Sequence, residues 1–227
     1  MHPVLFKTPY FTVYTYGVFV SLAMMLALFL SARRRPPVGA SSQDPLDLLL
    51  VLFVSGVIGA RVFFVLQHWE DYRGNIVSVL WLQKGGLVWY GGFLGAVACG
   101  AAVCHRRRLS ILRWADFFAP ILALAHAVGR VGCFFNGCCH GLHYPVQLFE
   151  SALLVALSLF LFFKSRSSAV VGEIFGFYLI GYAAIRFGLE FLRADQTAYF
   201  SLTIPQWISL AIAFFSFFYF KALRKRS

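Results

Sequence analysis

Seven stretches of mostly apolar residues follow one another along the chain, separated by short polar or glycine-containing segments. Each is close to the ~20 residues that a helix needs to cross ~30 Å of hydrocarbon. They are Thr12–Ala32, Leu46–Gln67, Leu87–Cys104, Trp114–Gly132, Val146–Phe163, Val171–Leu192 and Ile204–Phe220. The pattern predicts an all-α, polytopic membrane protein of about seven transmembrane helices, which forms a single integral membrane domain over residues 1–227.

Basic residues gather in the connections on one side of these predicted helices. Of the 20 Lys and Arg residues, 13 lie on the side of the C-terminus, four lie on the other side, and three lie inside the stretches. Because basic loops stay in the cytoplasm, we expect the N-terminus outside and the C-terminus cytoplasmic. Only 13% of the residues are charged, against about a quarter in a soluble domain. Membrane topology therefore explains the net charge of +11, and nucleic acid is not an expected partner.

Of the charged residues inside the predicted helices, five lie in the outer half of the membrane according to this topology. They are Arg61, Arg130, Glu150, Arg186 and Glu190. A charge in hydrocarbon costs ~2.5–3.5 kcal/mol, so each needs a partner. Arg186 and Glu190 are four residues apart and share a helix face, which is typical of an internal salt bridge. Three arginines against two glutamates leave a surplus positive charge, and a bound lipid phosphate would balance it.

Glycine is frequent where the helices are expected to meet or end. The pairs Gly56 and Gly59, Gly91 and Gly95, and Gly172 and Gly176 allow close helix contact. The segment Gly129–Gly141 has four glycines in thirteen residues, which predicts a non-helical backbone. Such a backbone is tolerated at membrane depth only beside a cavity or other protein. This arrangement would place Arg130 and Asn136 to bind a polar ligand.

The same segment and the residues after it collect soft metal ligands: Cys133, Cys138, Cys139, His140 and His143. Three interpretations stay open. Zinc or copper is conceivable by ligand type, although the spacing matches no familiar zinc pattern. A disulfide is favoured by the oxidising outer side. Packing of small residues in a glycine-rich loop is the third interpretation, and we expect no metal.

Several short motifs lie near the places where the apolar stretches begin and end. They are His2-Pro3, Tyr16-Gly17, Gly59-Ala60-Arg61, Tyr90-Gly91-Gly92-Phe93-Leu94-Gly95, Gly129–Gly141, Tyr144-Pro145-Val146-Gln147-Leu148-Phe149-Glu150, and the helix with Arg186, Glu190 and Arg193. In this order they resemble the motifs of the bacterial prolipoprotein diacylglyceryl transferases, and the resemblance runs nearly end to end. It implies a multi-pass enzyme of the bacterial cytoplasmic (inner) membrane that acts in lipoprotein biosynthesis. Such an enzyme moves the diacylglyceryl group of phosphatidylglycerol to a cysteine thiol of a preprolipoprotein, releases glycerol phosphate and needs no cofactor.

The resemblance also assigns roles to residues. It makes Arg130 and Arg186 the phosphate-binding, catalytic arginines. The residues expected to bind substrate are Tyr16, Arg61, Gly91, Gly92, Asn136, Glu150 and Glu190. Tyr90 stands where the family commonly has a histidine, and a tyrosine is a poor base at neutral pH unless nearby arginines shift it. Tyr90 is therefore a candidate base, and His140 and His143 are the alternatives.

The family pattern is also broken at Cys133, Cys138 and Tyr144. Two other functions consequently remain: a paralogue with another acceptor, and a non-enzymatic phospholipid-binding or transport protein. The position of the charges disfavours transport, since no matching polar set in the inner half completes a pathway.

Overall fold

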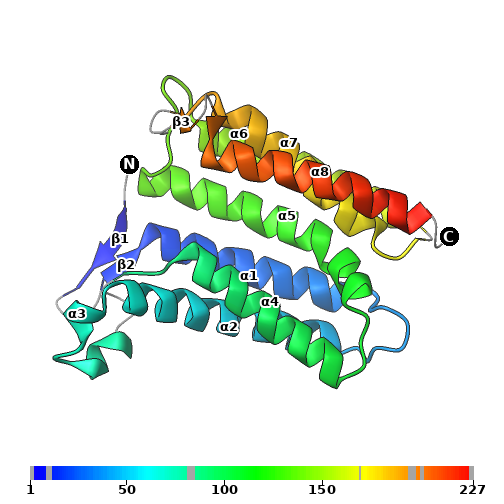
Figure 1. Ribbon diagram of the computed structural model, residues 1–227. Coiled ribbons are helices and arrows are strands. Elements are labelled where there is room, and N and C mark those ends of the chain that lie inside the picture. The colour runs from blue at the N-terminus through cyan, green and yellow to red at the C-terminus, as the bar shows by residue number, and fades with distance from the viewer. Residues whose placement is uncertain are drawn as a thin grey trace. The chain divides into compact units, whose positions relative to one another are not determined.

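The computed structural model describes residues 3–8, 12–80, 85–168, 170–193, 198–199 and 202–224, and most of them are helical (Figure 1). The helices are α1 Thr15–Arg33, α2 Asp44–Gln67, α3 Trp69–Tyr72, η1 Ile76–Leu80, α4 Trp89–Arg106, α5 Ile111–Asn136, α6 Val146–Lys164, α7 Glu173–Glu190 and α8 Ile204–Arg224. Two short hairpins are formed by β1 Val4–Lys7 with β2 Thr12–Tyr14, and by β3 Ala198–Tyr199 with β4 Leu202–Thr203. Each of the seven predicted stretches coincides with one long helix over most of its length.

Five of these helices are long and apolar enough to cross a membrane: α1, α2, α5, α6 and α8. The other two long helices, α4 and α7, have 18 residues each. Four of the residues of α4 are glycines, and α7 carries Glu173, Arg186 and Glu190, which lowers the hydropathy of both. The prediction of a helical, polytopic membrane protein is confirmed at this level. The number of spans and the orientation of the termini remain predictions.

The chain divides into two compact units. The first unit is Met1–Arg33 with Leu112–Ser227, and the second unit is Arg34–Ile111. The first unit therefore holds α1 and α5 to α8, and the second holds α2 to α4.

Glycines let α2 and α4 of the second unit approach each other closely. A Cβ at Gly95 would lie 2.6 Å from the backbone oxygen of Ser55 and 3.2 Å from the Cα of Gly59. A Cβ at Gly59 would collide with the backbone oxygen of Gly91. The prediction of close helix contact at these glycines is confirmed, and a methyl group at Gly59 has nowhere to go because its neighbours are backbone atoms.

We expect Gly59→Ala to lower the free energy of unfolding by about 1–3 kcal/mol, the usual cost of overpacking. Gly56→Ala is the matched control on the same helix, because its Cβ would lie 3.5 Å from the backbone oxygen of Gly92, an ordinary contact. Alanine has the higher helix propensity, so Gly56→Ala should leave stability unchanged or raise it by up to about 1 kcal/mol. Denaturant titration in detergent micelles measures both variants. Equal stability of the two would contradict this account of the α2–α4 contact.

In the first unit, two serines of α6 fix its register against α5. Ser151 donates a hydrogen bond to the backbone oxygen of Ala127 (2.9 Å), and Ser158 donates one to that of Pro120 (2.7 Å). The two bonds lie seven residues apart on each of two antiparallel helices, so a shift by one residue would break both. This register brings Glu150 of α6 opposite the part of α5 that carries Arg130.

The N-terminal end of α7 is held by a carboxylate of α5. Asp116 accepts hydrogen bonds from the backbone N–H of Gly172 and of Phe175 (2.8 Å), so it satisfies two donors at the start of α7. The hydroxyl of Tyr219, from α8, donates to the backbone oxygen of Gly172 (2.9 Å). Gly172 has φ +94°, a conformation that glycine adopts readily. Asp116 thus joins α5, α7 and α8 at this end of the unit.

Two sequence-based predictions of local structure are wrong. The first is that Thr12–Tyr14 belongs to the first helix. These residues form β2, which pairs with β1, as suits a Thr-Val-Tyr run of high strand propensity. The second is a non-helical backbone from Gly129 onward: α5 continues to Asn136, and the break comes at Gly137, with φ +77°.

Of the glycines inside that part of α5, Gly132 allows close packing. A Cβ at Gly132 would lie 2.6 Å from the Cβ of Phe19 on α1, and 3.5 Å from the ring of Tyr16. The small residue therefore lets α1 and α5 approach each other, while α5 keeps its helical hydrogen bonds.

Candidate functional site

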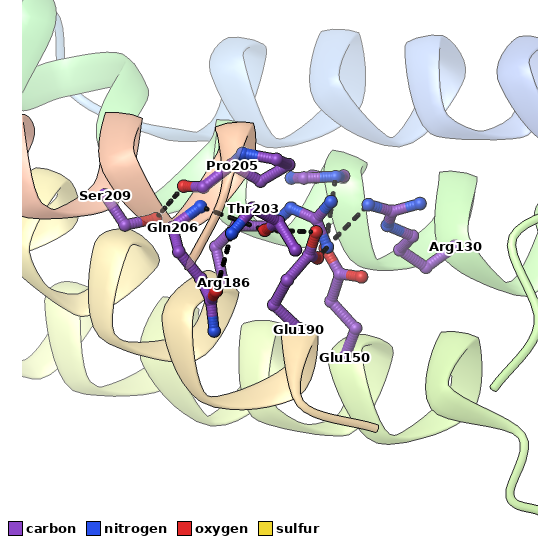
Figure 2. A network of polar contacts seen from close by, with 9 residues as sticks. Arg130, Glu150, Arg186, Glu190, Thr203, Pro205, Gln206 and Ser209 are labelled. Atoms are coloured by element: carbon purple, nitrogen blue, oxygen red, sulfur yellow. Dashed lines mark hydrogen bonds and ion pairs between the residues drawn. The ribbon is translucent and has the colours of Figure 1, made fainter. Parts of the chain in front are cut away.

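Two buried ion pairs lie in the first unit (Figure 2). Nη2 of Arg130 lies 2.8 Å from Oε1 of Glu150, and Nη1 of Arg186 lies 2.9 Å from Oε2 of Glu190. The Glu150 and Glu190 side chains are 1% and 0% exposed, whereas those of Arg130 and Arg186 are 14% and 13% exposed. Each carboxylate is thus enclosed, whereas each arginine side chain keeps a small accessible fraction. The predicted pairing of Arg186 with Glu190 on one helix face is confirmed.

The second carboxylate oxygen of Glu190 ties α7 to the start of α8. Oε1 accepts a hydrogen bond from the hydroxyl of Thr203 (2.9 Å), and the backbone N–H of Thr203 donates to Oε1 of Gln206 (2.9 Å). Figure 2 shows Glu190, Thr203 and Gln206 joined in this order beside Arg186. Glu190 is thus held at Oε1 by Thr203 and at Oε2 by the ion pair with Arg186, and these contacts fix the position of Arg186.

A histidine that the sequence analysis overlooked lies beside the first pair. Nε2 of His126 is 4.0 Å from Oε1 of Glu150, the oxygen that also faces Arg130. His126 precedes Arg130 by one helical turn on α5, and its ring centroid is 5.4 Å from that of Tyr182 on α7. The available signal was the four-residue spacing of His126 and Arg130, which puts both on one helix face.

The loop between α5 and α6 is anchored to the helices around it. The amide of Gln147 donates to the backbone oxygen of Cys138 (2.7 Å), and the backbone N–H of Leu142 donates to the oxygen of Leu192 (3.1 Å). Gly141 also forms a β-bridge with Arg193. The loop is therefore held against the first turn of α6 and the end of α7. Asn136 is the last residue of α5 and is partly buried, while His140 and His143 in the loop are exposed.

All five cysteines are free thiols, so the structure forms no disulfide among Cys133, Cys138 and Cys139. Within the described residues, no group of three or more His, Cys, Asp or Glu side chains is arranged to hold a metal ion. The thiol of Cys133 is close enough to hydrogen-bond to Cys139, and this bond, with the positive charge of Arg193, lowers the pKa of the Cys139 thiol. Cys139 is exposed, whereas Cys133 is buried, so the charge of a thiolate is better accommodated at Cys139.

The remaining predicted site residues belong to the second unit, and Arg61 has a well-defined environment there. Its buried guanidinium donates to the backbone oxygens of Val79 (2.7 Å) and Gly85 (2.6 Å), and more weakly to those of Ser78 and Gly86. Arg61 thus fastens η1 and the residues Gly85 and Gly86. Its predicted part in substrate binding is not tested by these contacts and stays a prediction.

Tyr90, Gly91 and Gly92 lie in the first turn of α4. Tyr90 is exposed and makes an edge contact with Trp89, at 5.3 Å between ring centroids. Gly91 and Gly92 face α2, where a Cβ at Gly92 would lie 3.1 Å from the backbone oxygen of Gly56. Their packing role is evident, and their predicted roles at the substrate stay predictions.

The charge balance differs from the one that the sequence suggested. In the first unit, Arg130 and Arg186 are matched one to one by Glu150 and Glu190, and the third arginine, Arg61, donates to carbonyls of the second unit. The capacity of Arg130 and Arg186 to bind an anion therefore rests on the guanidinium N–H donors that the ion pairs leave unused. A guanidinium has five N–H donors. Each of these two makes a single ion pair with a described residue, and Nε of Arg130 has no hydrogen-bond partner among them.

Such a structure defines a class: a multi-pass helical membrane protein with two arginines held at fixed positions by buried carboxylates. The family of prolipoprotein diacylglyceryl transferases matches residues 3–221, and the chain belongs to this family. It is 32% identical to the phosphatidylglycerol–prolipoprotein diacylglyceryl transferase of Bacillus mycoides (strain KBAB4), with 95% of this chain and 89% of the relative aligned. The proteins of the same name from Clostridium novyi (strain NT) and Finegoldia magna (strain ATCC 29328) are each 30% identical. Their alignments cover 92% and 87% of this chain and 91% and 86% of the relatives.

Proposed function

We propose that this chain is a phosphatidylglycerol–prolipoprotein diacylglyceryl transferase. It transfers the diacylglyceryl group of phosphatidylglycerol to the cysteine thiol of a preprolipoprotein lipobox and releases glycerol phosphate. Family membership over nearly the whole chain supports this proposal. The structural observation that supports it is the pair of arginines Arg130 and Arg186. Each is fixed by a buried glutamate, and each has N–H donors left for a phosphate.

The chemistry suits these side chains. The acceptor sulfur attacks the glycerol carbon that bears the phosphate, the carbon–oxygen bond breaks, and its electron pair stays with the phosphate. Arginines held beforehand around that phosphate stabilise the charge that develops on it. The thiol must lose its proton, because the thiolate is the nucleophile.

The proposal extends to topology and to the residues around the phosphate. Seven spans, an outside N-terminus and a cytoplasmic C-terminus would form one domain in the bacterial inner membrane, as the distribution of basic residues favours. The substrates are then phosphatidylglycerol and preprolipoproteins. Tyr16, Arg61, Gly91, Gly92 and Asn136 are proposed to line the substrate, together with the ion-paired glutamates Glu150 and Glu190. The base is proposed among histidine and tyrosine side chains, with Tyr90, His140 and His143 the ones that the sequence suggests.

The test uses purified protein in phosphatidylglycerol liposomes with a lipobox peptide, followed by mass spectrometry. We expect the peptide to gain the mass of a diacylglyceryl group on its cysteine, and a peptide with serine at that position to gain nothing. Phosphatidylglycerol binding without any mass gain on a range of lipobox peptides would overturn the proposal in favour of a non-enzymatic lipid-binding protein or another acceptor.

A further inference from the structure

The proposed reaction needs a base, and His126 has the surroundings of one. Of the histidines that the structure describes, His126 is the one that lies within 4.0 Å of a buried carboxylate, that of Glu150. Its side chain is 31% exposed, although its Nε2 lies close to the buried carboxylate. A carboxylate beside an imidazole orients the ring and favours the imidazolium that forms when the ring takes up a proton, and here it acts against the positive charges of Arg130 and Arg186.

The position of His126 relative to the arginines also suits this role. His126 and Arg130 are one turn apart on α5 and face the same oxygen of Glu150, so a base and a phosphate-binding group are held by one carboxylate. The separation of 4.0 Å is longer than a hydrogen bond. Catalytic hydrogen bonds are often long before substrate binds and shorten in the complex.

We propose that His126 is the general base that takes the proton from the acceptor cysteine, with Glu150 orienting its ring. This assignment rests on the proposed transferase function. With Nε2–H directed toward Glu150, Nδ1 is the nitrogen that accepts the proton of the thiol. The thiolate forms its bond to the glycerol carbon as the carbon–oxygen bond breaks, and the proton passes from the imidazolium to the released phosphate. No oxidant or further reactant is needed.

Other candidate bases lack this arrangement. His140 and His143 lie exposed in the loop, and the described residues include no carboxylate in an ion pair with either. Tyr90 is exposed beside Trp89 in the second unit. His126 alone among these four is held against both Glu150 and, through it, Arg130.

The experiment compares His126→Asn with wild type on two acceptor peptides in phosphatidylglycerol liposomes, one with cysteine and one with selenocysteine in the lipobox. We expect kcat with the cysteine peptide to fall by about 10²-fold or more, the usual size of a general-base effect, with KM little changed. The selenol is already ionised at neutral pH and needs no base, so most of the loss should disappear with the selenocysteine peptide. His105→Asn, at the exposed end of α4, is the matched control and should keep the wild-type rate.

Several results would overturn the assignment. Equal losses on both peptides would mean that His126 has a structural role. A full rate in His126→Asn, with a selective loss in Tyr90→Phe, His140→Asn or His143→Asn, would move the base to that residue. If His126→Asn fails to fold, as judged by size-exclusion chromatography and phosphatidylglycerol binding, the same comparison is made with His126→Gln. Absence of transfer by the wild-type protein would instead overturn the proposed function itself, and the base with it.

Discussion

Replacing Arg130 or Arg186 by lysine is expected to lower the rate of diacylglyceryl transfer by ~10²–10³-fold, the effect of losing one preorganised donor to a developing charge. Lysine keeps the positive charge, so Glu150 and Glu190 keep a counter-ion. It lacks the planar fork that can bind a carboxylate on one side and a phosphate on the other. Each variant should therefore fold and bind lipid but turn over slowly.

The measurement is the rate of peptide modification at saturating phosphatidylglycerol, with Arg73→Lys as the control. Arg73 lies 2.6 Å from Glu70 in an ion pair at the exposed surface, so its replacement should leave the rate unchanged. Alanine variants are less informative, because each would leave a glutamate of 1% or 0% exposure without its counter-ion. Wild-type turnover in a folded Arg130→Lys, Arg186→Lys double variant would contradict phosphate binding by these side chains.

Glu150→Gln is expected to lower the free energy of unfolding by about 3–5 kcal/mol, the cost of removing one partner from a buried ion pair. Glutamine keeps the shape of the side chain but not its charge. The guanidinium of Arg130, which lies 2.8 Å from Glu150, is then left without its counter-ion in a poorly solvated position. Denaturant titration in detergent micelles measures the loss.

Glu70→Gln is the control for Glu150→Gln, because it breaks an ion pair of similar length on the exposed surface. It should cost no more than about 1 kcal/mol. Replacing both Arg130 and Glu150 by leucine should recover most of the stability, since apolar residues in place of a buried pair are often neutral, but should abolish transfer. Equal losses in Glu150→Gln and Glu70→Gln would show that the Arg130 pair is solvated.

Much of the fold was predictable because hydropathy and membrane thickness restrict it strongly. Every predicted stretch coincides with a helix over most of its length. The first residues of α6, Val146, and of α8, Ile204, are the predicted ones. The close contact of α2 and α4 at their glycine pairs was also predictable, since small residues at helical spacing in a membrane helix are typical of helix–helix contacts.

The features that the sequence did not predict depend on contacts between segments that are distant in sequence. Glycine composition alone could not reveal that Gly132 lies against Phe19 in a continuous helix. The charge of Arg61 was counted with Arg130 and Arg186, although its donors go to carbonyls that carry no signal in the sequence. His126 was missed because its partner, Glu150, lies on another helix.

The ion pairs of the first unit also bear on how the chain enters the bilayer during synthesis. Arg186 and Glu190 lie on one helix, and Glu150 belongs to the helix that directly follows that of Arg130. Chains emerge from the ribosome with the N-terminal segments first. In the proposed seven-span topology, Arg186 therefore enters the membrane together with Glu190, and Arg130 obtains its counter-ion when the next helix, α6, is inserted. During synthesis, neither arginine then depends on a segment distant in sequence for its counter-ion.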